Sequence, residues 1–339
     1  MVEARWYEKI EDQKVRCYLC NHRCLIKEGD RGICFVRQNH QGTLYSLVYG
    51  KPIARHVDPI EKKPLFHFYP GTASYSIATA GCNFSCLFCQ NADISQAKES
   101  RNLFIGKDVL PDEIVRSALA AGCRSISYTY TEPTIFLEYA LDIARSASAQ
   151  GLGNVFVSNG YMTPEALDSL RPHLHAANVD LKAFRESFYQ TQCKAKLTPV
   201  LESLKKMKRM GVWLEVTTLI IPTLNDSPSE VADLARFIVE ELGPETPWHI
   251  SRFHPTYRLN DLPRTPVKTL QAAWEIGKRQ GLRYVYTGNV PGERGEKTFC
   301  FQCGSLLLDR FGFSILKNNL VEGHCPQCQT RLDGMGLER

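Results

Sequence analysis

Short apolar or β-branched runs alternate with helical stretches from about residue 74 onward. The apolar runs predict strands, and the stretches with helical periodicity predict helices between them. Strands separated by single helices indicate parallel β/α units. We therefore predict an α/β protein with a partial or full (β/α) barrel, with a doubly wound open sheet as the alternative. The predicted strands are 75–80, 125–131, 154–158, 177–181, 213–220, 248–253 and 283–287, and the predicted helices are 111–121, 134–150, 164–170, 200–210, 227–242 and 267–280.

The segments on either side of this alternation have a different character. Residues 1–70 are irregular, with turn signals at Gly29-Asp30 and Gly32, and we expect a small cysteine-containing module there. Residues 71–297 would form the barrel core. Residues 298–339 would form a separate, cysteine-rich C-terminal tail.

Composition and charge narrow the class of protein. The chain of 339 residues is 43% hydrophobic and 23% charged, which is ordinary for a globular protein. Its net charge of +5 does not by itself indicate a nucleic-acid partner. No apolar run approaches the roughly 20 residues that span a bilayer, and the charged N-terminus lacks the apolar region of a secretory signal. We therefore expect a cytoplasmic protein with no membrane partner.

Thirteen cysteines are many for a cytoplasmic protein, in which metal binding explains clustered cysteines better than disulfides do. Eleven of them fall into three groups, whereas Cys123 and Cys193 stand alone. The N-terminal quartet is Cys17, Cys20, Cys24 and Cys34; the loop triplet is Cys82, Cys86 and Cys89; the C-terminal quartet is Cys300, Cys303, Cys325 and Cys328.

The loop triplet has C-x3-C-x2-C spacing directly after the first predicted barrel strand. Three thiolates on one short loop can each bind a different iron of a cubic cluster, so that the fourth iron stays open to a small molecule. The alternatives are buried structural cysteines or a zinc site that takes a fourth ligand from elsewhere. Zinc prefers paired Cys-x2-Cys knuckles and four ligands, so the spacing favours a [4Fe–4S] cluster.

The two quartets predict further metal sites. The C-terminal quartet consists of two Cys-x2-Cys knuckles with 21 residues between them, which is typical of a zinc ribbon. A rubredoxin-like iron site with the same geometry is the alternative. The N-terminal quartet could hold zinc or a second iron–sulfur cluster, and its spacing does not decide between them. Four structural cysteines are the remaining interpretation.

The loop triplet resembles the cluster-binding loop of the radical SAM superfamily, which follows the first strand of a (β/α) barrel. The resemblance implies that the open iron binds S-adenosylmethionine and that the cluster cleaves this cofactor reductively. The products would be methionine and a 5′-deoxyadenosyl radical, which abstracts a hydrogen atom from the substrate. In this family an aromatic residue often precedes the third cysteine and lies near the adenine, and Phe88 matches it.

Residues at the ends of later predicted strands resemble cofactor-binding segments of the same family. Residues 130–133 are similar to the family's Gly-Gly-Glu-Pro segment, which binds the amino group of the cofactor. Glu132 matches the acid of that segment, and Tyr130 and Thr131 replace its glycines. A carboxylate that faces an ammonium group forms a charge-assisted pair. The resemblance implies further cofactor contacts, with structural roles as the alternative, at Ser158, Asn159, Asp180, Lys182 and Thr218.

One of these positions, Thr218, depends on which way side chains point along a strand. Neighbouring strand residues point to opposite faces, so one of Thr217 and Thr218 faces the barrel interior, and we select Thr218. His249 on the sixth predicted strand is a candidate proton carrier or substrate contact, and a structural histidine is the alternative.

The widest resemblance is to the radical SAM member of the AmmeMemoRadiSam system, which is related to pyruvate formate-lyase activating enzymes. The sequence around the N-terminal quartet, residues 58–71 and residues 81–96 carry this resemblance. It implies Memo-like and AMMECR-like partner proteins, and the chemistry requires an electron donor such as flavodoxin or ferredoxin. It does not identify a substrate.

Three classes of function follow. The first is a radical SAM enzyme that abstracts hydrogen from an unidentified substrate. The second is an activating enzyme that generates a glycyl radical on a partner protein. The third is a non-enzymatic iron–sulfur or zinc scaffold, which would release no 5′-deoxyadenosine after reduction in the presence of the cofactor.

Overall fold

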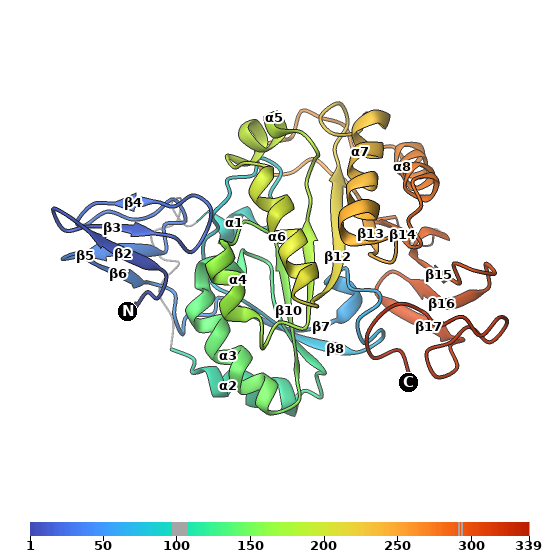
Figure 1. Cartoon of the computed structure of the whole chain (residues 1–339), viewed down its shortest axis with the longest axis horizontal. Coiled ribbons are helices and arrows are strands. Elements are labelled where there is room, and N and C mark those ends of the chain that lie inside the picture. The colour runs from blue at the N-terminus through green and yellow to red at the C-terminus, as the bar shows by residue number, and fades with distance from the viewer. Residues whose placement is uncertain (97–107, 291, 293, 339) are drawn as a thin grey trace.

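Eight strands form one sheet in the computed structural model, which describes residues 1–96, 108–290, 292 and 294–338 (Figure 1). The strands follow one another in chain order from β7 to β14; β7 pairs antiparallel with β8, and all later neighbours pair in parallel. A doubly wound sheet would reverse its strand order at a switch point. The sequential order therefore confirms a (β/α) barrel type, which stays open between β7 and β14. The strands are β7 (Ala54–Pro59), β8 (Ala73–Ala78), β9 (Ser125–Tyr128), β10 (Gly153–Ser158), β11 (Ala176–Asp180), β12 (Trp213–Ile220), β13 (Trp248–Arg252) and β14 (Val285–Gly288).

The longer helices that the structure describes cover one face of this sheet (Figure 1). Several begin with proline, whose fixed φ suits a first helical turn, and the hydroxyl groups of Thr163 and Ser227 cap two of them. None of the described helices is both long enough and apolar enough to span a membrane. The helices are α1 (Ala92–Ser95), α2 (Pro111–Ala120), α3 (Leu137–Ala149), α4 (Pro164–Leu170), α5 (Glu186–Phe188), α6 (Thr198–Arg209), α7 (Pro228–Phe237) and α8 (Val267–Arg279); shorter 3-10 or π turns are Ile60–Lys62, Pro133–Phe136, Tyr189–Cys193, Ile238–Leu242 and Arg294–Glu296.

The two faces of the large sheet differ in polarity. On the face under the helices, a Cβ at Gly277 of α8 would lie 3.0 Å from both Trp248 and Val285, so helix and sheet pack closely there. The opposite face, which we call the inner face, carries polar side chains from neighbouring strands in register. They are Asn178, Glu215, Thr217, His249 and Tyr286.

The segment between β7 and β8 covers part of the inner face. The backbone N–H groups of Phe66 and His67 donate to Glu215, and the side-chain amide of Asn178 donates to the carbonyl oxygen of Pro64. Arg310 of the C-terminal tail donates to the carbonyl oxygen of Phe66 at 2.8 Å. Segment 60–68 is therefore held between the sheet and the tail.

The N-terminal residues fold into more regular structure than we predicted. Residues 1–53 contain two small antiparallel sheets, with the strand orders β1-β6-β5 and β2-β3-β4. The irregular interpretation was wrong because these strands are only two to four residues long, too short to show a clear alternation. β7 lies within the predicted N-terminal module but pairs with the barrel. The strands are β1 (Val2–Glu3), β2 (Tyr7–Ile10), β3 (Lys14–Cys17), β4 (Leu25–Ile26), β5 (Arg37–His40) and β6 (Thr43–Ser46).

The C-terminal tail forms a small three-stranded antiparallel sheet with the order β15-β16-β17. The two cysteine pairs of the C-terminal quartet stand before β16 and after β17, so both knuckles lie at ends of this sheet. The tail packs beside β14, at the opposite end of the molecule from the N-terminal sheets (Figure 1). The strands are β15 (Thr298–Phe299), β16 (Leu306–Phe311) and β17 (Ser314–Asn318).

Candidate functional site

The loop triplet lies directly after β8, at the carboxyl-terminal edge of the parallel sheet. The chain turns there at Gly81, whose φ of 98° is accessible to glycine without strain. A Cβ at Gly81 would lie 2.6 Å from Val36 Cγ1 and 3.0 Å from the carbonyl oxygen of Cys34. The glycine therefore allows the N-terminal module to pack directly against the cysteine loop.

The sulfur atoms of the loop triplet lie beside N–H, O–H and S–H groups. A backbone N–H of the loop donates to Cys82 Sγ at 3.3 Å, and Ser95 Oγ lies 3.2 Å from Cys89 Sγ. Burial raises the pKa of the Cys82 and Cys89 thiols, whereas a hydrogen bond with Cys193 lowers the pKa of Cys86. The thiolate is the metal-binding form of cysteine, and metal binding releases the proton. This donor set fits a cluster that is held by three thiolates.

Glu132 connects the exits of β9 and β10. Its carboxylate accepts hydrogen bonds from the backbone and hydroxyl groups of Thr134, from the Ser158 hydroxyl at 2.8 Å and from the Asn159 N–H at 2.8 Å. Burial raises the pKa of Glu132. Since four donors surround this carboxylate, it orients the two loops, and its direct contact with the cofactor stays a prediction.

Asn159 connects this carboxylate to the cysteine loop. Its side-chain amide donates to Asn83 Oδ1 at 2.7 Å and lies 4.0 Å from Cys82 Sγ. The predicted residues Glu132, Ser158 and Asn159 are thus brought together beside the first cysteine of the triplet. Together with Cys82 after β8, these residues come from the ends of three different strands, as expected for a site at the carboxyl end of a barrel.

Asp180 ends β11, Lys182 follows it, and the two form an ion pair of 2.7 Å. Lys182 Nζ also lies 5.8 Å from the centre of the Phe88 ring, so the structure brings these three predicted residues together. Burial would lower the pKa of Lys182, but the Asp180 carboxylate and the Cys86 sulfur raise it well above its ordinary value. Lys182 therefore stays charged next to the cysteine loop.

Thr218 points away from this site. Its hydroxyl donates to the carbonyl oxygen of Leu181 at 2.8 Å and accepts from Trp248 Nε1 at 2.9 Å, on the face that the helices cover. Thr217 lies on the inner face, and its buried hydroxyl oxygen has no hydrogen-bond partner among the described residues. We therefore correct the selection from Thr218 to Thr217.

His249 is part of a buried structural network. Its Nε2 lies 2.6 Å from a carboxylate oxygen of Glu215, which also accepts from Trp213 Nε1 and from two backbone N–H groups of segment 60–68. Burial alone would raise the pKa of Glu215, but His249 and the other donors lower it. His249 is therefore held by a buried carboxylate inside this network, which supports the structural alternative over proton transfer.

The structure adds a polar cluster that the sequence did not indicate. Lys63 Nζ lies 2.7 Å from Asp58, and the Tyr130 hydroxyl donates to the same carboxylate. Lys63 also lies 4.5 Å from the centre of the Tyr130 ring, and burial lowers the pKa of Lys63 to about 8. Tyr130 has a φ of 63°, a left-handed conformation at a position where the resembling family has glycine. The tyrosine in place of this glycine was the one feature of the sequence that could have pointed to the cluster.

Cys193 is a second residue that sequence reasoning left aside. It ends the π turn Tyr189–Cys193, and its carbonyl oxygen accepts from the backbone N–H of Ser85 at 3.0 Å. Its thiol lies against Cys86, whose pKa it lowers. The turn therefore supports the cysteine loop from a distant part of the chain, which spacing alone could not reveal.

The C-terminal quartet gathers all four sulfur atoms within 4.8 Å of one another. Cys300 and Cys328 are 3.6 Å apart, as are Cys303 and Cys325. Hydrogen bonds with Ser305 lower the pKa of Cys303 to about 6. Ligands at about 2.3 Å from one tetrahedral zinc would be separated by about 3.8 Å, so this quartet fits one metal ion.

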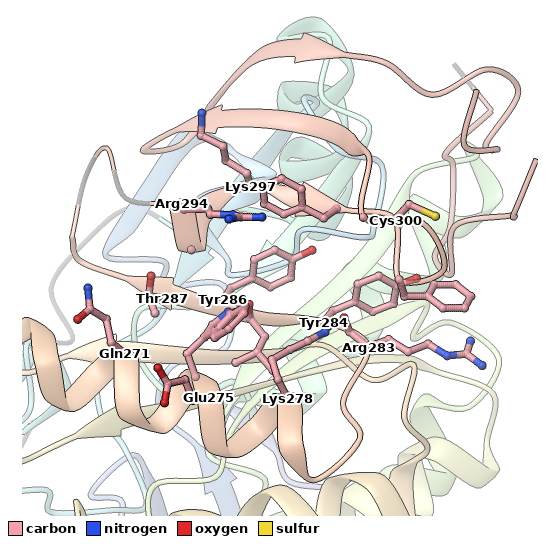
Figure 2. A pocket seen from close by; sticks show the side chains of 16 residues that line it. Gln271, Glu275, Lys278, Arg283, Tyr284, Tyr286, Thr287, Arg294, Lys297 and Cys300 are labelled. Atoms are coloured by element: carbon pink, nitrogen blue, oxygen red, sulfur yellow. Dashed lines mark hydrogen bonds between the residues drawn. The ribbon is translucent and has the colours of Figure 1, made fainter. Parts of the chain in front are cut away.

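A cavity of about 520 Å³ lies between α8, β14 and the tail (Figure 2). Lys278 from α8 and Arg294 and Lys297 from the tail side border it, together with the rings of Tyr284 and Tyr286. The predicted cofactor contacts do not line this cavity, so it is separate from the strand-end site.

Comparisons with known proteins agree with this geometry. Residues 76–238 match the Radical SAM superfamily. An uncharacterized protein of Methanocaldococcus jannaschii is 46% identical over 98% of this chain and 99% of its own length. Pyruvate formate-lyase-activating enzyme of Clostridium pasteurianum is 23% identical over 47% of this chain and 66% of that enzyme. The structure of a radical SAM methyltransferase from Sphaerobacter thermophilus aligns with a TM-score of 0.51 and 17% identity, over 68% of this chain and 71% of that one, which shows a shared fold.

Proposed function

Because the chain belongs to the radical SAM superfamily, we propose that its loop triplet holds the [4Fe–4S] cluster at which S-adenosylmethionine is cleaved. The family prediction is confirmed, and with it the interpretation of the chain as an enzyme rather than a scaffold. The observation that carries the cluster assignment is the position of three thiols on the exit loop of β8, beside the residues that follow β9, β10 and β11.

The bound cluster supplies an electron that breaks the cofactor's sulfur–carbon bond and gives a radical that takes a hydrogen atom from substrate. The protein's own residues bind and orient the reactants. Lys182 offers a charged amine for the cofactor's carboxylate. Asp180, whose carboxylate lies 2.7 Å from Lys182 Nζ, orients this amine. Asn159, next to Cys82, offers its side-chain carbonyl oxygen as an acceptor for the amino group of the cofactor.

The remaining assignments differ in how directly each residue would act. Glu132 and Ser158 hold the exits of β9 and β10 in register and act as positioning residues. Phe88 lies beside Lys182 and supplies an apolar surface for the adenine. Thr217, whose buried hydroxyl oxygen lacks a partner among the described residues, would bind a polar group of the cofactor or substrate.

The substrate would lie against the inner face of the sheet. The cluster of Asp58, Lys63 and Tyr130 offers a carboxylate, an amine and a phenol close to the strand-end site. Such groups bind a polar substrate by hydrogen bonds and charge. They do not decide between a metabolite, RNA and a segment of a protein.

A protein substrate is the second candidate, and a specific observation favours it. The similar enzyme of Clostridium pasteurianum is named for activating pyruvate formate-lyase. By analogy, this chain would generate a glycyl radical on a partner protein. The wider resemblance also suggests Memo-like and AMMECR-like partners, and reduction of the cluster requires a donor such as flavodoxin or ferredoxin.

The tail would hold a structural zinc ion. The close packing of its four sulfur atoms fits a single tetrahedral metal, and zinc is the common metal in paired Cys-x2-Cys knuckles. A tail without redox chemistry would serve for stability or for docking a partner. The reduced thiols and the iron–sulfur chemistry together suit the cytoplasm.

The cluster assignment is tested by Cys86→Ala, with Cys123→Ala as the matched control, since Cys123 is another buried cysteine but lies outside all three groups. After anaerobic reconstitution and reduction, we expect the wild type and Cys123→Ala to form 5′-deoxyadenosine from S-adenosylmethionine. Cys86→Ala should form only background amounts and lose the iron of the loop. Equal yields from both variants at matched iron content would refute the assignment.

The two substrate classes are separated by size. Deuterium-labelled cell extract is divided into a protein fraction and a small-molecule fraction, and each is incubated with the reduced enzyme and S-adenosylmethionine. Deuterium in 5′-deoxyadenosine from the protein fraction, with a glycyl radical signal in electron paramagnetic resonance, would support the activating enzyme. Deuterium from the small-molecule fraction alone would exclude it.

A further inference from the structure

We propose that the N-terminal quartet binds a second iron–sulfur cluster, held by all four of its thiolates. The quartet spans the end of β3 and the turns that follow it, next to the cysteine loop but separate from it. The inference concerns a second metal centre and does not depend on the loop triplet binding iron.

The four thiols enclose one common space. They line a single void of about 20 Å³ together with the side chains of His22, Arg37 and Asn83. All four cysteines are free; Cys17 and Cys34 are buried, and Cys20 and Cys24 are partly buried. Four thiols without disulfides that face one void are expected where a metal displaces their protons.

Two buried donors that face this void support a bound anionic group. Arg37 and Asn83 are each 1% exposed, and the Nε and Nη1 atoms of Arg37 and the Nδ2 atom of Asn83 have no acceptor among the residues that the structure describes. Buried N–H groups almost always have a partner, so these three atoms need an explanation. A cluster with four thiolates carries negative charge on its sulfur atoms, which would accept these hydrogen bonds.

The spacing of the sulfur atoms separates a cluster from a single ion. Among the residues that the structure describes, the C-terminal quartet alone brings at least three ligand atoms within 4.8 Å of one another. The N-terminal thiols are more widely spaced, and a water-sized sphere fits between them. Four sulfur atoms bound at about 2.3 Å to one zinc ion would leave no such space. The N-terminal quartet therefore fits several metal atoms rather than one.

The site also contacts the cysteine loop at Asn83. Asn83 lines the void, its carbonyl oxygen lies 2.7 Å from His22 Nε2, and its side-chain oxygen accepts from Asn159. Asn83 directly follows Cys82 in the chain. The second cluster would therefore lie beside the loop that we assign to the first, with a single asparagine between the two sets of ligands.

The test counts metal in variants that empty one site at a time. The triple variant Cys82→Ala/Cys86→Ala/Cys89→Ala removes the loop ligands, and Cys17→Ala/Cys20→Ala removes two ligands of the quartet. After anaerobic reconstitution we expect about eight irons per chain in the wild type and about four in each variant. Mössbauer spectra should show a four-iron cluster in the triple variant. Zinc in the tail, about one per chain, serves as the marker that each variant has folded.

Each alternative has its own metal count. A triple variant with no iron and about two zinc ions would overturn the proposal, because the quartet would then be a zinc site. A triple variant with neither iron nor extra zinc would also overturn it. A wild type with about four irons, all retained by the triple variant, would support the N-terminal cluster and instead refute the loop assignment.

Discussion

The two cysteine quartets have the same number of thiols but different surroundings; one belongs to the N-terminal module and the other to the tail, and the small sheets of these two parts lie at opposite ends of the molecule (Figure 1). The C-terminal quartet is partly exposed, its sulfur atoms are tightly gathered, and hydrogen bonds lower the pKa of Cys303. The N-terminal quartet is more buried and more widely spaced, and it lies beside Arg37 and Asn83, which have three nitrogen atoms without an acceptor among the described residues. The spacing and the neighbours of the thiols, more than their number, would then select the metal centre.

The largest expected effect is the loss of the metal proposed for the tail. Cys300→Ala/Cys325→Ala should remove the proposed zinc ion and unfold the tail, because metal binding at a structural site contributes about 10 kcal/mol of folding free energy. Limited proteolysis should then cleave within β16 and β17, whereas the iron content stays unchanged. A loss of iron in this variant would contradict the separation of the two quartets.

A smaller effect is expected at the buried pair of Arg37 and Glu138 beside the N-terminal quartet. Arg37→Met leaves the carboxylate of Glu138 buried and unpaired, so stability should fall by about 3–5 kcal/mol. Arg37→Met/Glu138→Leu should recover most of the melting temperature. If Arg37 also donates to a cluster, the double variant should still lose N-terminal iron faster on exposure to oxygen. Equal iron retention in the wild type and in the double variant would show that Arg37 pairs with Glu138 but does not donate to a cluster.

The attachment of the tail should depend on pH through His67. Its Nδ1 donates to the carbonyl oxygen of Asp333 and its Nε2 accepts from the Tyr286 hydroxyl, so the folded protein holds the neutral ring. Burial lowers the pKa of His67 to about 4, below the usual 6.5. Between these values the unfolded chain binds more protons, so stability falls as the pH drops from 6.5 to 4, by about 3 kcal/mol. Denaturant unfolding of wild type and His67→Phe between pH 4 and 6.5 should show that the free energy of unfolding depends less on pH in the variant. An unchanged dependence on pH would assign it to other titrating groups.

The smallest effect distinguishes two glycines with similar backbone conformations. Gly81 and Gly304 have φ values of 98° and 76°, but a Cβ meets the Cys34 carbonyl oxygen at Gly81 and nothing within 4 Å at Gly304. Gly304→Ala should cost about 1 kcal/mol for the left-handed backbone alone. Gly81→Ala should cost up to about 3 kcal/mol and reduce iron retention, as measured by thermal unfolding and metal analysis. Equal losses of stability in Gly81→Ala and Gly304→Ala would mean that the N-terminal module does not pack closely against the cysteine loop.

The barrel and the strand-end cluster of residues were predictable because they rest on local patterns. The alternation of strands and helices predicted the sequential sheet, and β7 was missed because its sequence, Ala54–Pro59, is half polar and mostly exposed. Cysteine spacing identified the three cysteine groups but did not predict the distances between their sulfur atoms. Thr218 was selected over Thr217 because strand alternation shows that two neighbours point apart but not which one points inward. Contacts such as Cys193 against the loop depend on tertiary folding, which no local pattern encodes.

The cover over the inner face also determines how reactants travel. Segment 60–68 is bound to Glu215 on one side and to Arg310 of the tail on the other, so the gap between β7 and β14 is closed there. We therefore expect reactants to reach Thr217 from the rim where the strands end, and not through that gap. A macromolecular substrate would then present an extended segment at that rim.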